Sequence, residues 1–291
     1  MQGSDPAELR AYADAVLGQH EAGDLEGALE SCERLLAATA QGDLEDPVVR
    51  ETLFTARFER ALLLTELGEL EVAAEAYAQA ATTPADMDDP DQRHERAMAQ
   101  LNHGICLVAA GDHRGALRVY DELIAVFRDA ADPVTRDQVV RARVNRSATL
   151  LALGDAAAAR AAAEELLEEL DERDALDAEQ LVMSLRLRAA AFQGEDRDAE
   201  AAEALAVAES LEAEDAAARV QVVAASRERA ELLAALGRFE QAAAVANAVV
   251  ARFSGDPDPA VIGAVEELVE QERSLRAVFA PHDVDPIDPV L

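Results

Sequence analysis

Residues 89–120 read DPDQRHERAMAQLNHGICLVAAGDHRGALRVY. The stretch opens with an Asp-Pro step, contains no further proline, and continues after Gly111 with apolar residues at helical spacing, among them Ala116, Val119 and Tyr120. Aspartate accepts the free amide bonds of a helix's first turn, and proline at the next position loses no hydrogen bond. Glycine takes the left-handed conformation that ends many helices. The stretch therefore predicts a helix, a turn at Gly111 and a second helix.

This pattern recurs along the chain at intervals of about 43 residues. The glycines that mark the turn each have an alanine five residues later, and they are Gly23, Gly68, Gly111, Gly154, Gly194 and Gly237. A second series consists of aspartates that precede the first helix of each unit, most of them followed directly by proline: Asp5, Asp46, Asp89, Asp132, Asp174, Asp215 and Asp258. Because both series keep the same period, the chain is predicted to be an array of helix–turn–helix repeats.

Six such repeats account for most of the chain. Their expected ranges are 6–45, 46–88, 89–131, 132–173, 174–214 and 215–257. We expect a further amphipathic helix at 259–278 to cover the apolar side of the last repeat, as the end of a solenoid requires. The predicted organisation is a single continuous superhelix over residues 1–279. Residues 280–291 contain three prolines and no periodicity, which indicates an extended or disordered acidic tail.

The unit resembles the tetratricopeptide repeat in its long bacterial form. The matching features are a glycine with an acidic neighbour, the downstream alanine, an aromatic residue four positions after that alanine, and a small residue seven positions before the glycine. The aromatic and small residues are Tyr77, Tyr120, Ala61, Gly104, Ser147 and Ala230. The resemblance implies an all-α, right-handed α-solenoid of six helix pairs plus a capping helix. It also implies a non-catalytic scaffold that binds a protein or peptide on its concave face.

Several positions depart from the family pattern. Val16 and Leu187 stand where a small residue is expected, and the aromatic position holds Cys32, Ala163, Glu203 and Ala246 in the other repeats. Repeats 5 and 6 are therefore the weakest matches. HEAT repeats share the period range, but the proline and Asp/Arg pattern that is typical of their helices is missing from this sequence.

The charge of the chain restricts its partners. It has 291 residues, with 59 acidic side chains against 26 basic ones, and the formal net charge is −33. Such a charge repels phosphate backbones and anionic lipids, so nucleic acid and membrane surfaces are not expected as partners. No signal peptide or membrane span is apparent, and the abundance of alanine and arginine without any lysine suggests a bacterial coding sequence. We expect a bacterial cytoplasmic protein.

The sequence lacks the common motifs for catalysis and for metal binding. The sequence has no glycine-rich phosphate loop, no G-x-S-x-G elbow and no H-E-x-x-H motif. The five histidines are scattered, and Cys32 and Cys106 lie in helical apolar patterns without C-x-x-C spacing. We therefore expect no enzyme, no cofactor and no metal, and we expect the cysteines to be buried, inert thiols.

Basic residues are concentrated near the centre of the chain. Residues 101–150 carry a net charge of +1, whereas the flanking stretches are acidic. Eight positions before the marker glycine the repeats carry a column of basic residues: Arg60, His103, Arg146, Arg186 and Arg229. This column has two interpretations. It could line a groove for an acidic peptide or a C-terminal carboxylate, or it could supply packing and salt bridges between helices.

The resemblance also implies where a ligand would bind. In the family the groove is lined by the first helix of each repeat, and the positions that correspond to its polar contacts hold Asn102, Arg141, Asn145, Arg188 and Arg227. The full set of residues that grips a chaperone tail is not present. A peptide-sensing regulator is the alternative function, although no output module is evident. Self-docking of the acidic tail at 280–291 is a further possibility for this groove.

Overall fold

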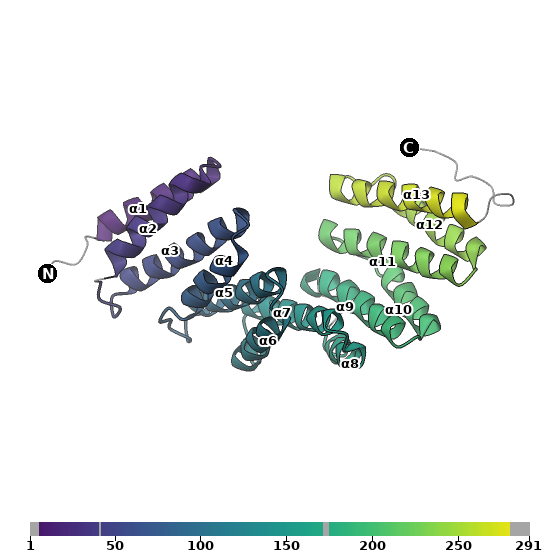
Figure 1. Cartoon of the computed structure of the whole chain (residues 1–291), viewed down its shortest axis with the longest axis horizontal. Helices are drawn as coiled ribbons and strands as arrows, with labels where there is room; N and C mark the ends of the chain where they lie inside the picture. The colour runs from purple at the N-terminus through teal and green to yellow at the C-terminus, as the bar shows by residue number, and fades with distance from the viewer. Residues whose placement is uncertain (1–5, 41, 171–174, 280–291) are drawn as a thin grey trace. The chain divides into compact units, whose positions relative to one another are not determined.

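The computed structural model describes residues 6–40, 42–170 and 175–279. Within these ranges the structure consists of α-helices and turns, with no strand (Figure 1). The helices are α1 (Pro6–Glu21), α2 (Leu25–Thr39), α3 (Pro47–Glu66), α4 (Leu70–Ala81), α5 (Pro90–Ala109), α6 (His113–Phe127), α7 (Pro133–Ala152), α8 (Ala156–Leu167), α9 (Ala175–Gly194), α10 (Asp198–Ser210), α11 (Ala216–Ala235), α12 (Phe239–Phe253) and α13 (Pro259–Phe279). The all-α fold is as predicted, and each expected repeat range holds two helices. The proposed tail at 280–291 lies outside the described residues.

The helix ends follow the predicted chemistry. Asp46 and Asp89 precede proline, and their side chains accept a hydrogen bond from the second backbone amide that follows. The glycines in the turns have positive φ at positions 23, 68, 111, 154 and 237. The aspartate side chains satisfy backbone amides that the start of a helix leaves without a partner. The left-handed glycines end the helix and turn the chain.

The chain forms two compact units, residues 1–149 and 150–291, and each is described on its own. In the first unit every helix from α1 to α5 packs against the next one in sequence, and α1 also packs against α3. In the second unit α9 to α12 pack in the same sequential manner, α9 contacts α11, and α11 contacts α13. First helices of successive repeats are therefore neighbours at these contacts, as Figure 1 shows for α9, α11 and α13.

Small residues allow the helices to approach closely. Gly104 on α5 faces the ring of Tyr120 on α6, and a Cβ atom at Gly104 would overlap that ring. Tyr120 is fully buried, in a cluster with Leu101, Leu123 and Phe127. The predicted roles of Gly104 as the small residue and Tyr120 as the aromatic one are thus confirmed.

The fifth repeat departs from the prediction. Gly194 is the last residue of α9, and the residue with positive φ in this turn is Asp196, at 58°. Gly194 serves a different purpose, since a Cβ atom there would lie 2.9 Å from the Cβ of Ala156 on α8. The assignment of Gly194 as the left-handed residue was therefore wrong. Close contact with α8 explains the glycine.

This correction moves the register of the fifth repeat by two residues. Five positions after Asp196 stands Ala201, which is buried, whereas the predicted marker Ala199 is exposed. Seven positions before Asp196 stands Ala189, which supplies the small residue that Leu187 appeared to replace. Nine positions after Asp196 stands Leu205, also buried, in place of the exposed Glu203. In the corrected register the fifth repeat matches the others more closely.

Two substitutions test this register. Gly237→Ala should lower the free energy of unfolding by about 1 kcal/mol, because a side chain would have to adopt left-handed backbone. Asp196→Gly should leave it unchanged or raise it by up to about 1 kcal/mol, because glycine removes the same strain from the fifth turn. Urea unfolding of both variants measures the difference. A clear loss of stability in Asp196→Gly would contradict the assignment.

Candidate functional site

Arginines of the predicted basic column form ion pairs with the preceding repeat. Nε of Arg60 on α3 lies 2.6 Å from Oε1 of Glu33 on α2, and Nε of Arg146 on α7 lies 2.6 Å from Oδ1 of Asp121 on α6. In the second unit Nη1 of Arg229 on α11 lies 2.6 Å from Oε2 of Glu209 on α10. Each pair joins the first helix of one repeat to the second helix of the repeat before it. This geometry supports the structural interpretation of the column.

Arg186 and Arg188 exchange roles in the corrected register. Eight positions before Asp196 stands Arg188, which therefore belongs to the column, and Arg186 lies ten positions before it, as Arg227 does before Gly237. Nε of Arg186 donates to both carboxylate oxygens of Glu228 on α11, at 3.1 Å. The sequence-based placement of Arg186 in the column and of Arg188 six positions before the turn was wrong, because both were counted from Gly194.

The predicted groove residues lie on first helices of both units. In the first unit Asn102 on α5 and Asn145 on α7 are partly buried, and Arg141 on α7 is exposed. Nε of Arg141 lies 2.8 Å from Oδ2 of Asp137, one turn away on the same helix. Exposed pairs of this kind contribute only about 0.3–0.5 kcal/mol, so a partner can compete for the guanidinium.

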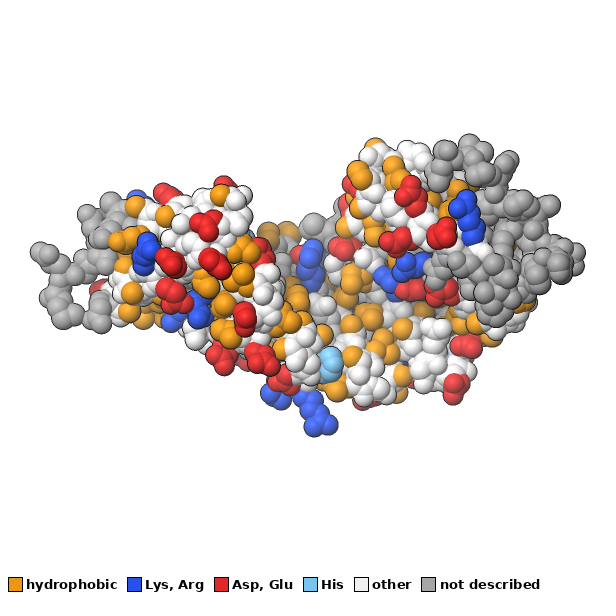
Figure 2. Space-filling model, turned by 45° about the horizontal axis from the view of Figure 1, so that its top comes forward, with side chains coloured by type: hydrophobic (Ala, Val, Ile, Leu, Met, Phe, Trp, Pro, Cys, Tyr) orange, Lys and Arg blue, Asp and Glu red, His pale blue; other side chains and the backbone are white. Residues whose placement is uncertain are grey.

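In the second unit the predicted residues have other contacts. Nη1 of Arg227 lies 3.2 Å from Oε2 of Glu267 on α13, so Arg227 links the first helix of the sixth repeat to the helix that follows that repeat. Arg188 lines a shallow cavity with Leu181, Leu185 and Val207. On the visible face of each unit, arginine side chains lie among carboxylates (Figure 2). The two groups of residues belong to different units.

A second column of arginines was missed in the sequence. Eighteen positions before the left-handed glycine, in the first turn of the first helix, stand Arg50, Arg93, Arg136 and Arg219. Nε of Arg93 lies 3.0 Å from Oδ2 of Asp132, and Nε of Arg219 lies 2.8 Å from Oδ2 of Asp256. Both arginines also donate to a backbone carbonyl of the preceding loop. The interval of 43 between residues 50 and 93 was the signal that could have revealed them.

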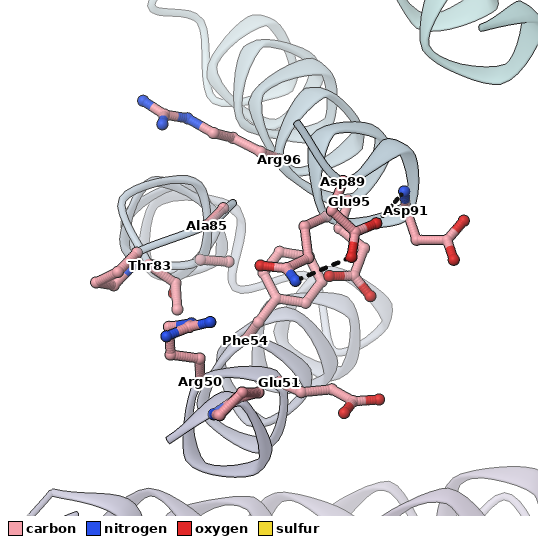
Figure 3. A pocket seen from close by; sticks show the side chains of 13 residues that line it. Arg50, Glu51, Phe54, Thr83, Ala85, Asp89, Asp91, Glu95 and Arg96 are labelled. Carbon is pink, nitrogen blue, oxygen red and sulfur yellow. Dashed lines mark hydrogen bonds between the residues drawn. The ribbon is translucent and has the colours of Figure 1, made fainter. Parts of the chain in front are cut away.

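At Arg50 the equivalent ion pair, which would be with Asp89, is not formed. Its Nη1 donates to the carbonyls of Leu44 and Glu45, at 3.0 and 3.2 Å, whereas its Nε is buried without a hydrogen-bond partner. The carboxylate of Asp89, which corresponds to Asp132, accepts instead from the amide of Asp91 and from Nε2 of Gln92. A pocket of about 200 Å³ lies there, lined by α3, α5 and the segment before α5 (Figure 3).

Comparisons with known proteins agree with the repeat pattern. A putative kinesin light chain with TPR-like repeats from Podosopora anserina is similar, with 18% identity and a TM-score of 0.54; the match covers 71% of this chain and 95% of that one. A tetratricopeptide repeat protein from Parabacteroides merdae shows 18% identity, a TM-score of 0.51 and coverage of 91% and 86%. The chain has the tetratricopeptide-repeat fold. No protein-family model matches it, and neither does any curated protein.

Another tetratricopeptide-type match was solved with a ligand. NprR in complex with its cognate peptide NprX has 11% identity and a TM-score of 0.52, and the match covers 97% of this chain and 79% of that one. At this identity the likeness concerns the fold.

The thiols of this tetratricopeptide-fold chain are buried. Cys32 and Cys106 are both free, and burial raises the pKa of the Cys32 thiol to about 12. Burial also raises the pKa of Cys106. Because the thiolate is the reactive form, the prediction of buried, inert thiols agrees with this environment. Among the described residues there is no group of three metal-ligating side chains, and none of the described helices is both long and apolar enough to cross a bilayer.

His20 connects two first helices of the tetratricopeptide fold. Its Nε2 lies 3.0 Å from Oε1 of Glu66 and its Nδ1 lies 3.3 Å from Oε2 of Glu59, both on α3. The hydrogen bond to Glu66 raises the pKa of His20 above 6.5, partial burial opposes the shift, and Glu59 adds to it. The imidazolium donates to both carboxylates, whereas the neutral ring can donate to one.

This arrangement predicts that the local stability of α1 depends on pH. A folded pKa above the unfolded value means that the stabilisation is present below about pH 6.5 and is lost as pH rises through the folded pKa. The effect should stay below about 1 kcal/mol, because the side chains are partly exposed. Hydrogen exchange of α1 between pH 6 and 8, corrected for intrinsic rates, measures it. His20→Gln should remove the dependence, and an equal slope in that variant would contradict the assignment.

Proposed function

We propose that the chain is a non-catalytic scaffold that binds a protein or peptide on the face made by the first helices of its tetratricopeptide repeats. One observation carries the proposal. On α5 and α7, which share one buried apolar cluster, Asn102, Asn145 and Arg141 offer amide and guanidinium groups. Arg60 and Arg146 are instead engaged in pairs between helices. The peptide complex of NprR gives a precedent for peptide binding on a similar fold.

The chemistry of these residues suggests the kind of segment that would bind. Asparagine side chains donate to and accept from an extended backbone, and arginine binds a carboxylate through charge-assisted hydrogen bonds. We therefore propose an extended segment that carries an acidic side chain or ends in a free carboxylate. Since residues 101–150 have a net charge of +1, such a segment meets less repulsion there than elsewhere on this acidic chain. A bacterial cytoplasm is the compartment that we propose.

Affinity capture from a bacterial extract, followed by mass spectrometry, tests the proposal. The double variant Arg141→Glu with Asn145→Ala should reduce capture of the main partner about tenfold or more, because it removes a hydrogen bond to a charged group and adds a repelling carboxylate. Arg34→Glu is the matched control. Arg34 also forms an exposed pair one turn away, with Glu30, but on the second helix α2. Capture that survives in the double variant would contradict the site.

A peptide-sensing regulator is the second candidate, favoured by the peptide in the NprR complex. In a sensor, ligand binding must shift the protein between two conformations, so the ligand has to bind one of them more tightly. Small-angle scattering of the chain with and without the captured peptide distinguishes the two candidates. A changed scattering curve favours the sensor, and an unchanged curve favours the scaffold.

A further inference from the structure

The pocket beside Arg50 occupies a position that an ion pair closes elsewhere in the chain. Arg93 with Asp132 and Arg219 with Asp256 form this pair directly. At the corresponding position, Arg50 keeps its bonds to loop carbonyls through Nη1, but Asp89 accepts from Asp91 and Gln92 instead, so that the guanidinium has no carboxylate partner among the described residues. One wall of the pocket therefore carries a guanidinium that no described carboxylate neutralises directly.

The opposite wall carries carboxylates. Glu95 on α5 is partly buried, and Asp89 and Glu51 line the same pocket. Burial and, to a smaller extent, the nearby carboxylates of Glu51, Asp91 and Asp89 together raise the pKa of Glu95 to about 6. Figure 3 shows Arg50 on one side of Phe54 and the carboxylates of Glu51 and Glu95 on the other, while Arg96 points away.

We propose that this pocket binds a zwitterionic α-amino acid, with its carboxylate on the guanidinium of Arg50 and its ammonium group beside Glu95. Such a ligand gives Arg50 an anionic partner and Glu95 a cationic partner at the same time. A simple anion would be repelled by Glu51, Asp89 and Glu95, and a simple cation would be repelled by the guanidinium of Arg50. The ring of Phe54 provides an apolar surface between the two charged walls.

The electrostatics of Glu95 give the proposal a pH signature. An ammonium group favours the ionised carboxylate, so binding should lower the pKa of Glu95 from about 6. The affinity is therefore expected to be constant above about pH 7 and to fall as Glu95 becomes protonated. This site is distinct from the groove residues Asn102, Arg141 and Asn145, so its test does not depend on the proposed function.

Isothermal titration of the full chain with each of the common L-α-amino acids, at pH 7.5, tests the proposal. Saturable binding of at least one of them is expected. Glu95→Gln and Arg50→Gln should each weaken it at least tenfold, and Arg50→Lys should weaken it less because it keeps the charge. Arg219→Gln is the matched control, since it breaks the corresponding closed pair in the second unit and should leave binding unchanged.

Two analogues of the amino acid that binds make the test sharper. The corresponding amine without the carboxylate, and the corresponding acid without the amino group, should both bind at least tenfold more weakly. Circular dichroism of each variant separates loss of binding from loss of folding. The proposal is overturned if none of the amino acids binds, if Glu95→Gln binds normally, or if the amine alone binds as well as the amino acid.

Discussion

Replacing Tyr120 by alanine is expected to lower the free energy of unfolding by about 3–5 kcal/mol. Only 1% of Tyr120 is exposed, and its ring fills the space that Gly104 leaves open on the neighbouring helix. Alanine would remove the ring from a cluster that includes Leu101, Leu123 and Phe127. The backbone cannot close the resulting cavity without moving α6 against α5, so most of the lost contact stays lost.

The measurement is urea unfolding followed by circular dichroism, together with hydrogen exchange of α5 and α6. Val126→Ala serves as the control on the same helix, because 49% of Val126 is exposed and its loss should change stability by no more than about 0.5 kcal/mol. Equal effects of the two substitutions would show that the contact between Gly104 and Tyr120 is not a main support of this repeat.

Leu205→Ala is expected to lower the free energy of unfolding by about 2–5 kcal/mol. Leu205 is 1% exposed and belongs to the core of the second unit, with Val182, Leu185 and Val222. In the register set by Asp196 it holds the position that Tyr120 holds in the third repeat. The large expected effect therefore follows from the corrected alignment as well as from burial.

Glu203→Ala is the matched control for this prediction. Glu203 is the residue that the uncorrected register places at the aromatic position, and it is exposed. Its replacement should change the free energy of unfolding by no more than about 0.5 kcal/mol. If urea unfolding instead showed that Glu203→Ala lowers the free energy of unfolding more than Leu205→Ala does, the result would support the register counted from Gly194.

The sequence predicted the helices well where local chemistry decides the structure. Helices begin at Pro47, Pro90, Pro133 and Pro259 because aspartate and proline satisfy the first turn without help from distant residues. The prediction failed at Gly194, because a glycine can serve either a left-handed turn or a close contact between helices. The close contact depends on Ala156, a residue of another helix, and no local pattern reveals it.

The candidate sites depended even more on distant contacts. The regular spacing of the basic column could be recognised in the sequence, but the carboxylates that pair with these residues lie on other helices, as Asp121 does for Arg146. The pocket beside Arg50 arises because Asp89, the acidic member of a recurring ion pair, accepts hydrogen bonds from Asp91 and Gln92 and not from Arg50. A sequence shows which charges recur, and the packing of the helices decides which of them meet.

The buried thiols have a practical consequence for spectroscopy. Cys32 and Cys106 are shielded inside the helix pairs, and the chain has no lysine side chain for amine-reactive dyes. A cysteine introduced at an exposed position, such as Val134 on α7 or Val207 on α10, would then be the thiol that reacts in the folded state. Fluorophores could be attached one at a time without removing the native cysteines.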